Sequence, residues 1–141
     1  MHTLQNNEYK FFAFRFTLFH LLVIVAGCRC SLDATIEGVV TLDGVPLTTG
    51  TVTFHPQGGG APAYGVISSN GEYSISTGAN KGLVAGKYVV TVVATTPPTS
   101  SLEFGNLLVP ERYGSLQQTP LRVTVIPGKN RINLDLTSKN D

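Results

Sequence analysis

The sequence of 141 residues predicts an all-β domain behind an N-terminal signal segment. Fifteen glycines, eight prolines and no tryptophan accompany many threonines and valines, a composition typical of short strands joined by turns. Seven short segments alternate apolar and polar residues, and turn residues separate them. These observations favour a seven-stranded β-sandwich in one domain, because the length suffices for one core but not for two.

The beginning of the chain has the pattern of an export signal. Lys10 and Arg15 precede an apolar run at residues 16–27. A basic start, about a dozen apolar residues and a small-residue end are typical of a segment removed after export. A membrane-spanning helix needs about 20 apolar residues, so an uncleaved anchor is the alternative with less support.

The signal ends in Val25-Ala26-Gly27-Cys28, which resembles the bacterial lipobox. The resemblance implies cleavage between Gly27 and Cys28, with a diacylglyceryl group on the Cys28 thiol and a further acyl chain, such as palmitate, on the new amine. Two or three acyl chains anchor a protein stably, whereas one does so only marginally. An ordinary signal peptide in which Cys28 is a chance residue is the alternative.

The second cysteine, Cys30, has no partner for an internal disulfide once Cys28 is acylated, because the chain contains two cysteines. A second acylation, an intermolecular disulfide and an exposed thiol in a tether all stay open. The predicted organisation is a signal at residues 1–27, a lipid-anchored tether at 28–34, the β domain at 35–137 and a tail at 138–141.

The first four strands are predicted at residues 35–42, 51–56, 63–69 and 72–76. Asn70-Gly71 separates the last two and predicts a hairpin, because both residues tolerate positive φ. Alternation points one set of side chains inward: Ile36, Val40, Leu42, Val52, Phe54, Tyr73 and Ile75.

The last three strands are predicted at residues 87–96, 121–126 and 131–136, with a turn at 127–130 between the final two. The first of them is apolar on both faces, which is typical of a central strand. The inward side chains are expected to be Tyr88, Val90, Val92, Ala94, Leu121, Val123, Val125, Ile132, Leu134 and Leu136.

Four stretches together resemble the carboxypeptidase regulatory-like domain: residues 36–56, 68–76, 83–92 and 109–136. That family has a prealbumin-like (transthyretin-like) Greek-key β-sandwich, and small bacterial envelope lipoproteins join an export signal to one such domain. The matching motifs are structural, such as the Asp43-Gly44 turn and the Gly86-Lys87-Tyr88 strand start. The resemblance implies no peptidase activity, because no catalytic domain accompanies it.

The sequence offers no recognisable active site. Beyond the signal, His55 is the only histidine, so neither the hydroxyisourate hydrolase site nor the iron site of intradiol dioxygenases of related topology can be built. His55 lies among outward-facing threonines and is expected to be exposed. The acidic residues are scattered, and the glycine-rich run 57–65 lacks the Lys-Ser/Thr of a phosphate loop. We therefore expect no enzyme, cofactor or metal.

The irregular segment at residues 96–120 is long for a connection, and such segments are often functional. Its apolar residues either cover an end of the sandwich, with Tyr113 as a plug, or form a recognition patch. We expect partner contacts from two loops at one end, residues 57–62 and 97–108, with Phe104 and Leu107 as candidate contact residues. The strand faces are expected to be plainly solvated.

The function expected is a non-catalytic, lipid-anchored binding or structural module of the bacterial cell envelope. Arg29 after the cysteine, where an Asp would favour inner-membrane retention, favours the outer membrane, with the domain facing the periplasm or the exterior. The partner would be an envelope protein or surface polymer and the module a monomer. A net charge of +1 excludes a nucleic-acid footprint. Alternatives are a carbohydrate-binding module, with Tyr64 and Tyr113 as platforms, and an uncharacterised hydrolase.

Overall fold

The computed structural model describes residues 32–98 and 105–139. The signal segment, Cys28, Cys30 and Phe104 lie outside the described residues. The fold is all-β, as predicted, and its helical content is one 3₁₀ turn within the described part. The elements are β1 (Ala34–Leu42), β2 (Val45–Pro46), β3 (Thr51–Pro56), β4 (Ala63–Val66), β5 (Glu72–Ser74), β6 (Ser76–Thr77), β7 (Asn80–Lys81), β8 (Gly86–Val93), η1 (Glu111–Gly114), β9 (Arg122–Val125), β10 (Gly128–Arg131) and β11 (Leu134–Leu136).

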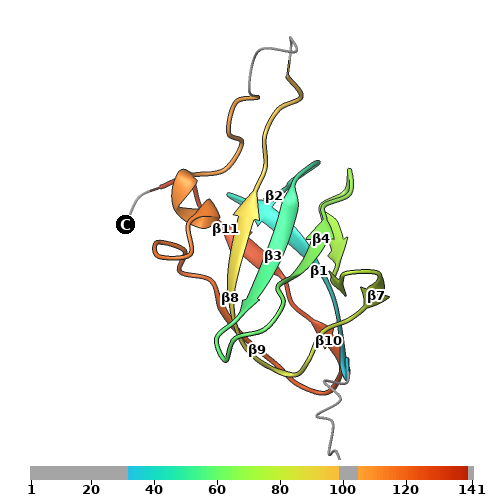
Figure 1. Ribbon diagram of the computed structural model, residues 1–141. Coiled ribbons are helices and arrows are strands. Elements are labelled where there is room, and N and C mark those ends of the chain that lie inside the picture. Colours follow the sequence, from blue (N-terminus) through green and yellow to red (C-terminus); the bar gives the residue numbers. More distant parts are fainter. Residues whose placement is uncertain (1–31, 99–104, 140–141) are drawn as a thin grey trace, which may run out of the picture.

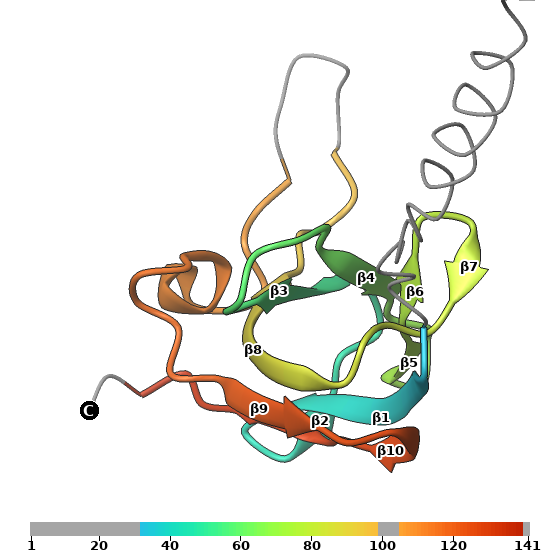
Figure 2. The same ribbon diagram turned by 60° about the horizontal axis from the view of Figure 1, so that its bottom comes forward.

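These strands form two open sheets (Figure 1). The five-stranded sheet centres on β1, which pairs with β2, β5, β10 and β11. The six-stranded sheet has the order β7-β6-β4-β3-β8-β9, so β8 lies between two partners, as its two apolar faces predicted. Figure 2 shows β1 and β10 on one side of the molecule and β3 and β4 on the other.

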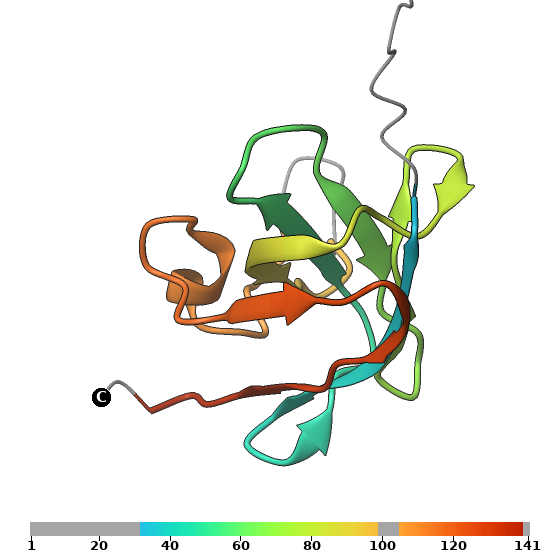
Figure 3. The ribbon, with the colours of Figure 1, turned by 90° about the horizontal axis from the view of Figure 1, so that it is seen from below.

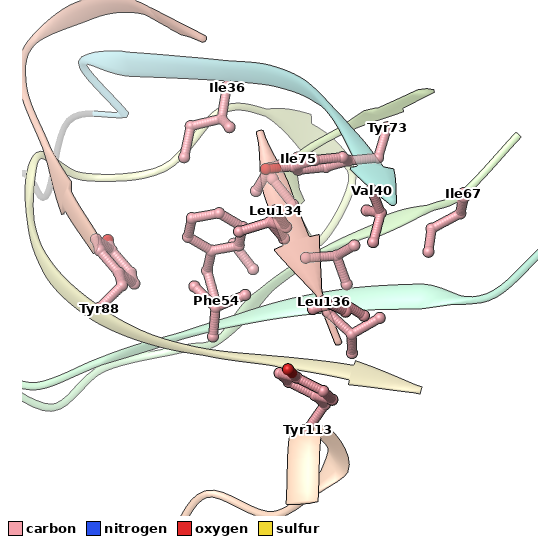
Figure 4. Packing of buried hydrophobic residues seen from close by; sticks show 14 of the residues in the cluster. Ile36, Val40, Phe54, Ile67, Tyr73, Ile75, Tyr88, Tyr113, Leu134 and Leu136 are labelled. Carbon is pink, nitrogen blue, oxygen red and sulfur yellow. The ribbon is translucent and has the colours of Figure 1, made fainter. Parts of the chain in front are cut away.

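The core fills the space between the sheets. Phe54 is fully buried, and its ring lies 6.4 Å from the ring of Tyr73 and 5.9 Å from the ring of Tyr88 (Figure 4). The predicted inward residues are either buried or packed partly buried against this cluster, because alternation in a strand fixes the face to which each side chain points.

The prediction of a hairpin at Asn70-Gly71 is wrong, because the strands on either side of this turn do not pair with each other. The turn itself forms, with Gly71 N–H donating to the Ser68 carbonyl at 2.9 Å, but β4 pairs with β3 and β6 while β5 pairs with β1. The chain therefore passes from one sheet to the other. Gly65 permits β5 to lie close to β4 after this crossing, because a Cβ on Gly65 would lie 2.2 Å from the Ser74 carbonyl oxygen.

The turn predicted at residues 127–130 is also wrong, because most of it is strand β10. This strand runs parallel to β1, with Ala34 opposite Gly128 and Glu37 opposite Arg131. After a break the chain pairs with β1 again as β11, from Val40 opposite Leu134. The last two predicted strands correspond to β9 and β11, and these lie in different sheets.

The break between β10 and β11 explains why residue 38 is glycine. The Ile132 carbonyl comes so close that a Cβ on Gly38 would lie 1.8 Å from its oxygen. Ile132 N–H donates to the Glu37 carbonyl at 2.9 Å, and the Tyr73 hydroxyl donates to the Ile132 carbonyl at 2.8 Å. Burial raises the pKa of the Tyr73 phenol well above its ordinary value, so the phenol stays a donor.

Candidate binding surface

An interrupted strip of exposed apolar side chains lies on the outer face of the six-stranded sheet, with Thr51 and Thr53 of β3 between them. Residues directly opposite on neighbouring strands share a face, and Thr51 lies opposite both Val66 on β4 and Val93 on β8. In the next row, Thr53 lies opposite Tyr64. The side chains of Val66, Tyr64 and Val93 are 70%, 50% and 46% exposed, although they belong to apolar or aromatic residues.

This strip corrects the expectation that the strand faces are plainly solvated. The sequence contains a signal for this strip, because residues 63–66 and 89–93 have apolar side chains at inward and at outward positions of their strands. The inward side chains, such as Val90 and Val92, pack in the core, and the outward ones lie on the surface.

The strip continues onto a two-stranded arm beyond the end of β8. Leu108 N–H donates to the Ala94 carbonyl at 2.8 Å, and Thr96 N–H donates to the Asn106 carbonyl at 2.9 Å. Leu107 lies opposite Thr95 in this ribbon and is 56% exposed. The arm projects from the top of the molecule in Figure 1. Phe104, the other candidate contact residue, lies outside the described residues.

The base of the arm is packed, and there the interpretation as a covering segment is correct. Val109 and Tyr113 are buried, and Tyr113 rises from η1 toward the core beside Leu136 (Figure 4). The guanidinium of Arg112 lies 4.7 Å from the centre of the Tyr113 ring and donates to the Lys139 carbonyl at 2.7 Å. Tyr113 is therefore no platform for a carbohydrate.

A hollow of about 310 Å³ joins the packed base to the exposed strip. Val93 and Leu107 line it from the strip, and Glu111 and Ser115 line it from the η1 side. We call the surface made by Tyr64, Val66, Val93 and Leu107 with this hollow the open face. It combines exposed apolar side chains with one carboxylate and one hydroxyl group, those of Glu111 and Ser115, at its edge.

The two candidate loops lie at opposite ends of the sheet, which corrects the expectation that they share one end. Residues 57–62 follow the end of β3, where Pro56 pairs with Tyr88 at the start of β8. The arm follows the end of β8, where Val93 pairs with Thr51 at the start of β3. The antiparallel register thus separates the loops by the length of the strands.

His55 is not the fully exposed side chain expected. It is partly buried on the outer face, and its Nε2 lies 3.1 Å from the hydroxyl of the buried Thr91. Burial lowers the pKa of His55, because it disfavours the charged imidazolium. The expectation considered only the threonines next to His55 on β3. The contact with Thr91 comes from the neighbouring strand β8.

Several carboxylates take part in structural hydrogen bonds. Asp33 accepts from Ala85 N–H at 2.8 Å, Asp43 accepts from Ser138 N–H at 3.1 Å, and Asp135 accepts from the Thr41 hydroxyl at 2.7 Å. The Ser138 hydrogen bonds lower the pKa of Asp43. Among residues 32–98 and 105–139, no group of three His, Cys, Asp or Glu side chains is placed to hold a metal ion.

Comparisons with protein families, with curated proteins and with solved structures find no match to this chain. In the described part of the chain, no helix has the length and apolar character needed to cross a membrane.

Proposed function

We propose that this chain is a non-catalytic, lipid-anchored binding module of the bacterial cell envelope, held at the membrane through Cys28. The open face is its contact surface for an envelope protein. The observation that carries the proposal is the exposed apolar strip of Tyr64, Val66 and Val93, which extends onto the arm at Leu107. Exposed apolar patches on small domains commonly mark interaction sites.

The direction of the chain supports this arrangement. β1 begins at the bottom of the molecule in Figure 1, and the arm projects at the top. An anchor at Cys28 lies four residues before Leu32, the first described residue. The membrane would then lie at the β1 end, and the arm would extend away from it toward a partner.

The proposal extends to the topology of the β domain. We infer a Greek-key sandwich of the carboxypeptidase regulatory-like type, in which the described residues form eleven short strands in two sheets instead of the seven longer strands expected. The all-β architecture supports this assignment, as do the Asp43-Gly44 turn and the strand start at Gly86. An outer-membrane location and a monomeric state belong to it as expectations.

The absence of a catalytic role is supported by the surroundings of His55. Its ring contacts the Thr91 hydroxyl, a neutral group that cannot orient a histidine as a carboxylate does. Asp33, Asp43 and Asp135 are committed to the hydrogen bonds that hold strand ends and turns. A hydrolase would need a base and an activated nucleophile within hydrogen-bond reach.

The test is capture of a partner from detergent-solubilised envelope by the mature lipidated protein. Leu107→Ser and Val93→Ser should each reduce capture of the wild-type partner, because both remove apolar area from the open face. Ile126→Ser is the matched control, since Ile126 is 61% exposed beside β9, away from the arm. Equal capture by wild type, Leu107→Ser and Val93→Ser would contradict the open face as the contact surface.

Carbohydrate binding is the second candidate function, and the observation in its favour is the half-exposed ring of Tyr64 on the open face. Sugars stack on exposed aromatic rings. Tyr64→Ala would then abolish retention on immobilised envelope polysaccharide while Tyr64→Phe would keep it. Equal retention of both variants, or none by the wild type, would exclude this candidate.

A further inference from the structure

A second hollow lies at the opposite end of the molecule, where β1 begins. Its volume is about 660 Å³, about twice that of the hollow in the open face. Figure 3 looks onto this end from below. Its apolar wall is formed by Leu32, Pro56, Ala61, Leu83, Val84 and Tyr88.

The apolar wall of this hollow suits an acyl chain, and Thr77, Asn80 and Lys87 line the rest of it. The Tyr88 hydroxyl donates to the Val84 carbonyl at 2.6 Å, so its polar end is already bonded. The glycines at 58–60 form one side with backbone alone, and a Cβ on Gly58 would meet nothing within 4 Å. Ligand sites in proteins typically have volumes of about 300–1,000 Å³ and mainly apolar linings.

The chain itself brings a suitable occupant to this position. Leu32 is the first described residue and already lines the hollow. Cys28 precedes it by four residues, which span at most about 13–14 Å when fully extended. Under the proposed function, Cys28 carries two or three acyl chains.

We propose that this hollow holds one acyl chain of the Cys28 lipid when the protein is outside a bilayer. The inference rests on the proposed function, because the lipid is its occupant. Each methylene that moves from water into an apolar site raises the equilibrium constant for binding of the acyl chain by a factor of about four. The module would thereby shield part of its own anchor during passage through water between membranes.

The test attaches the occupant chemically. The chain from Cys28 carries every residue of the buried core, which extends from Ala34 to Leu136. In this chain with Cys30→Ser, Cys28 is alkylated with N-hexadecylmaleimide, and the control sample receives N-methylmaleimide. We expect the hexadecyl protein to be monomeric without detergent. Its amide exchange at residues 57–61 and 83–88 should be at least several-fold slower than in the methyl control, with residues 105–108 unchanged.

Filling the hollow should remove this effect. Gly58→Trp places a ring where there is open space, and Ala61→Trp is a second filling variant from the same loop. Thr48→Trp is the matched control, because Thr48 is exposed and does not line the hollow. Both filling variants should be folded monomers with the methyl group and should associate with the hexadecyl group, whereas Thr48→Trp should behave as the parent chain.

Two results would overturn the inference. One is association of the parent hexadecyl protein in the absence of detergent, and the other is equal amide exchange with the hexadecyl and methyl groups. The mass of the N-terminus of protein from membranes tests the proposed function separately. A lipid on Cys28 together with equal exchange would overturn only the acyl-chain site, whereas an unmodified Cys28 would overturn both.

Discussion

The backbone N–H of Thr137 donates a hydrogen bond of 3.0 Å to the phenolic oxygen of Tyr113. Tyr113 lies in η1, after the arm, and Thr137 directly follows the last strand, β11. The bond thus fastens the base of the arm to the end of the five-stranded sheet. Arg112 strengthens the same junction by donating to the Lys139 carbonyl at 2.7 Å.

Loss of the Tyr113 hydroxyl should weaken this junction. Tyr113→Phe leaves the Thr137 N–H without its acceptor, and we expect a loss of about 1–2 kcal/mol in the free energy of unfolding, measured by urea titration. Tyr64→Phe is the matched control, because Tyr64 is half-exposed, and should change the free energy by less than about 0.5 kcal/mol. Equal effects of the two substitutions would show that the junction does not contribute to stability.

Gly38→Ala should be strongly destabilising. The new methyl group would lie 1.8 Å from the Ile132 carbonyl oxygen, so β1 and the break between β10 and β11 would have to separate. We expect a loss of at least about 2 kcal/mol, in the range of overpacked cores. The control is Gly58→Ala, where nothing lies within 4 Å of the added Cβ, and its urea midpoint should stay near that of the wild type.

Two positions on β8 test the assignment of its faces. Val90 is 0% exposed, so Val90→Asp places an unpaired charge in the core and should cost several kcal/mol or prevent folding. Val93 is 46% exposed on the open face, so Val93→Asp should fold with a melting temperature within a few degrees of the wild type. Comparable losses at both positions would mean that the outer face is covered.

Stability should decline slightly in mild acid because of His55. Burial lowers the pKa of His55 below 6.5 in the folded protein, so the unfolded chain binds more protons as the pH falls through that range. The melting temperature should therefore fall between pH 7.5 and pH 5. His55→Gln removes the titrating group and should reduce this fall; an identical pH profile for the variant would refute the assignment. The lowered pKa of Asp43 acts in a separate window, since its contribution is lost only as the pH falls below 3.8.

The arm gives a prediction that separates contact from packing. Replacing both Phe104 and Leu107 with Ser should weaken partner capture and leave the melting temperature within a few degrees, because Leu107 is 56% exposed. Val109→Ser is the contrasting variant, since Val109 is 4% exposed and its loss should cost stability. A large thermal loss in the double variant would show that the replaced side chains are packed rather than available for contact.

The sequence predicts the inward residues well because alternation is a local property of each strand. Phe54 and Val90 are buried because successive side chains of a strand point to opposite faces, and these two point into the core. Strand partners are not local in this sense. β1 pairs in parallel with residues 128–131, more than 90 positions later, and no turn dipeptide signals such a pairing.

The sequence predicts part of the candidate site. The apolar residues of a long connection indicate Leu107, and Leu107 is exposed on the arm. The prediction does not include Val66 and Val93, because the strand faces are expected to be solvated through their threonine, lysine and asparagine residues. Which side chains share the open face depends on the register of β3 with β4 and β8, and that register follows from tertiary pairing.

The proposed anchor of this domain is the lipid on Cys28, and the decisive measurement is intact mass spectrometry of the protein purified from the membrane fraction. We expect a chain that begins at Cys28 and carries a diacylglyceryl group with a further acyl chain. We also expect Cys28→Ala to abolish both lipid labelling and signal removal. A mature chain that begins at another residue, or an unmodified thiol at Cys28, would contradict the proposed anchor.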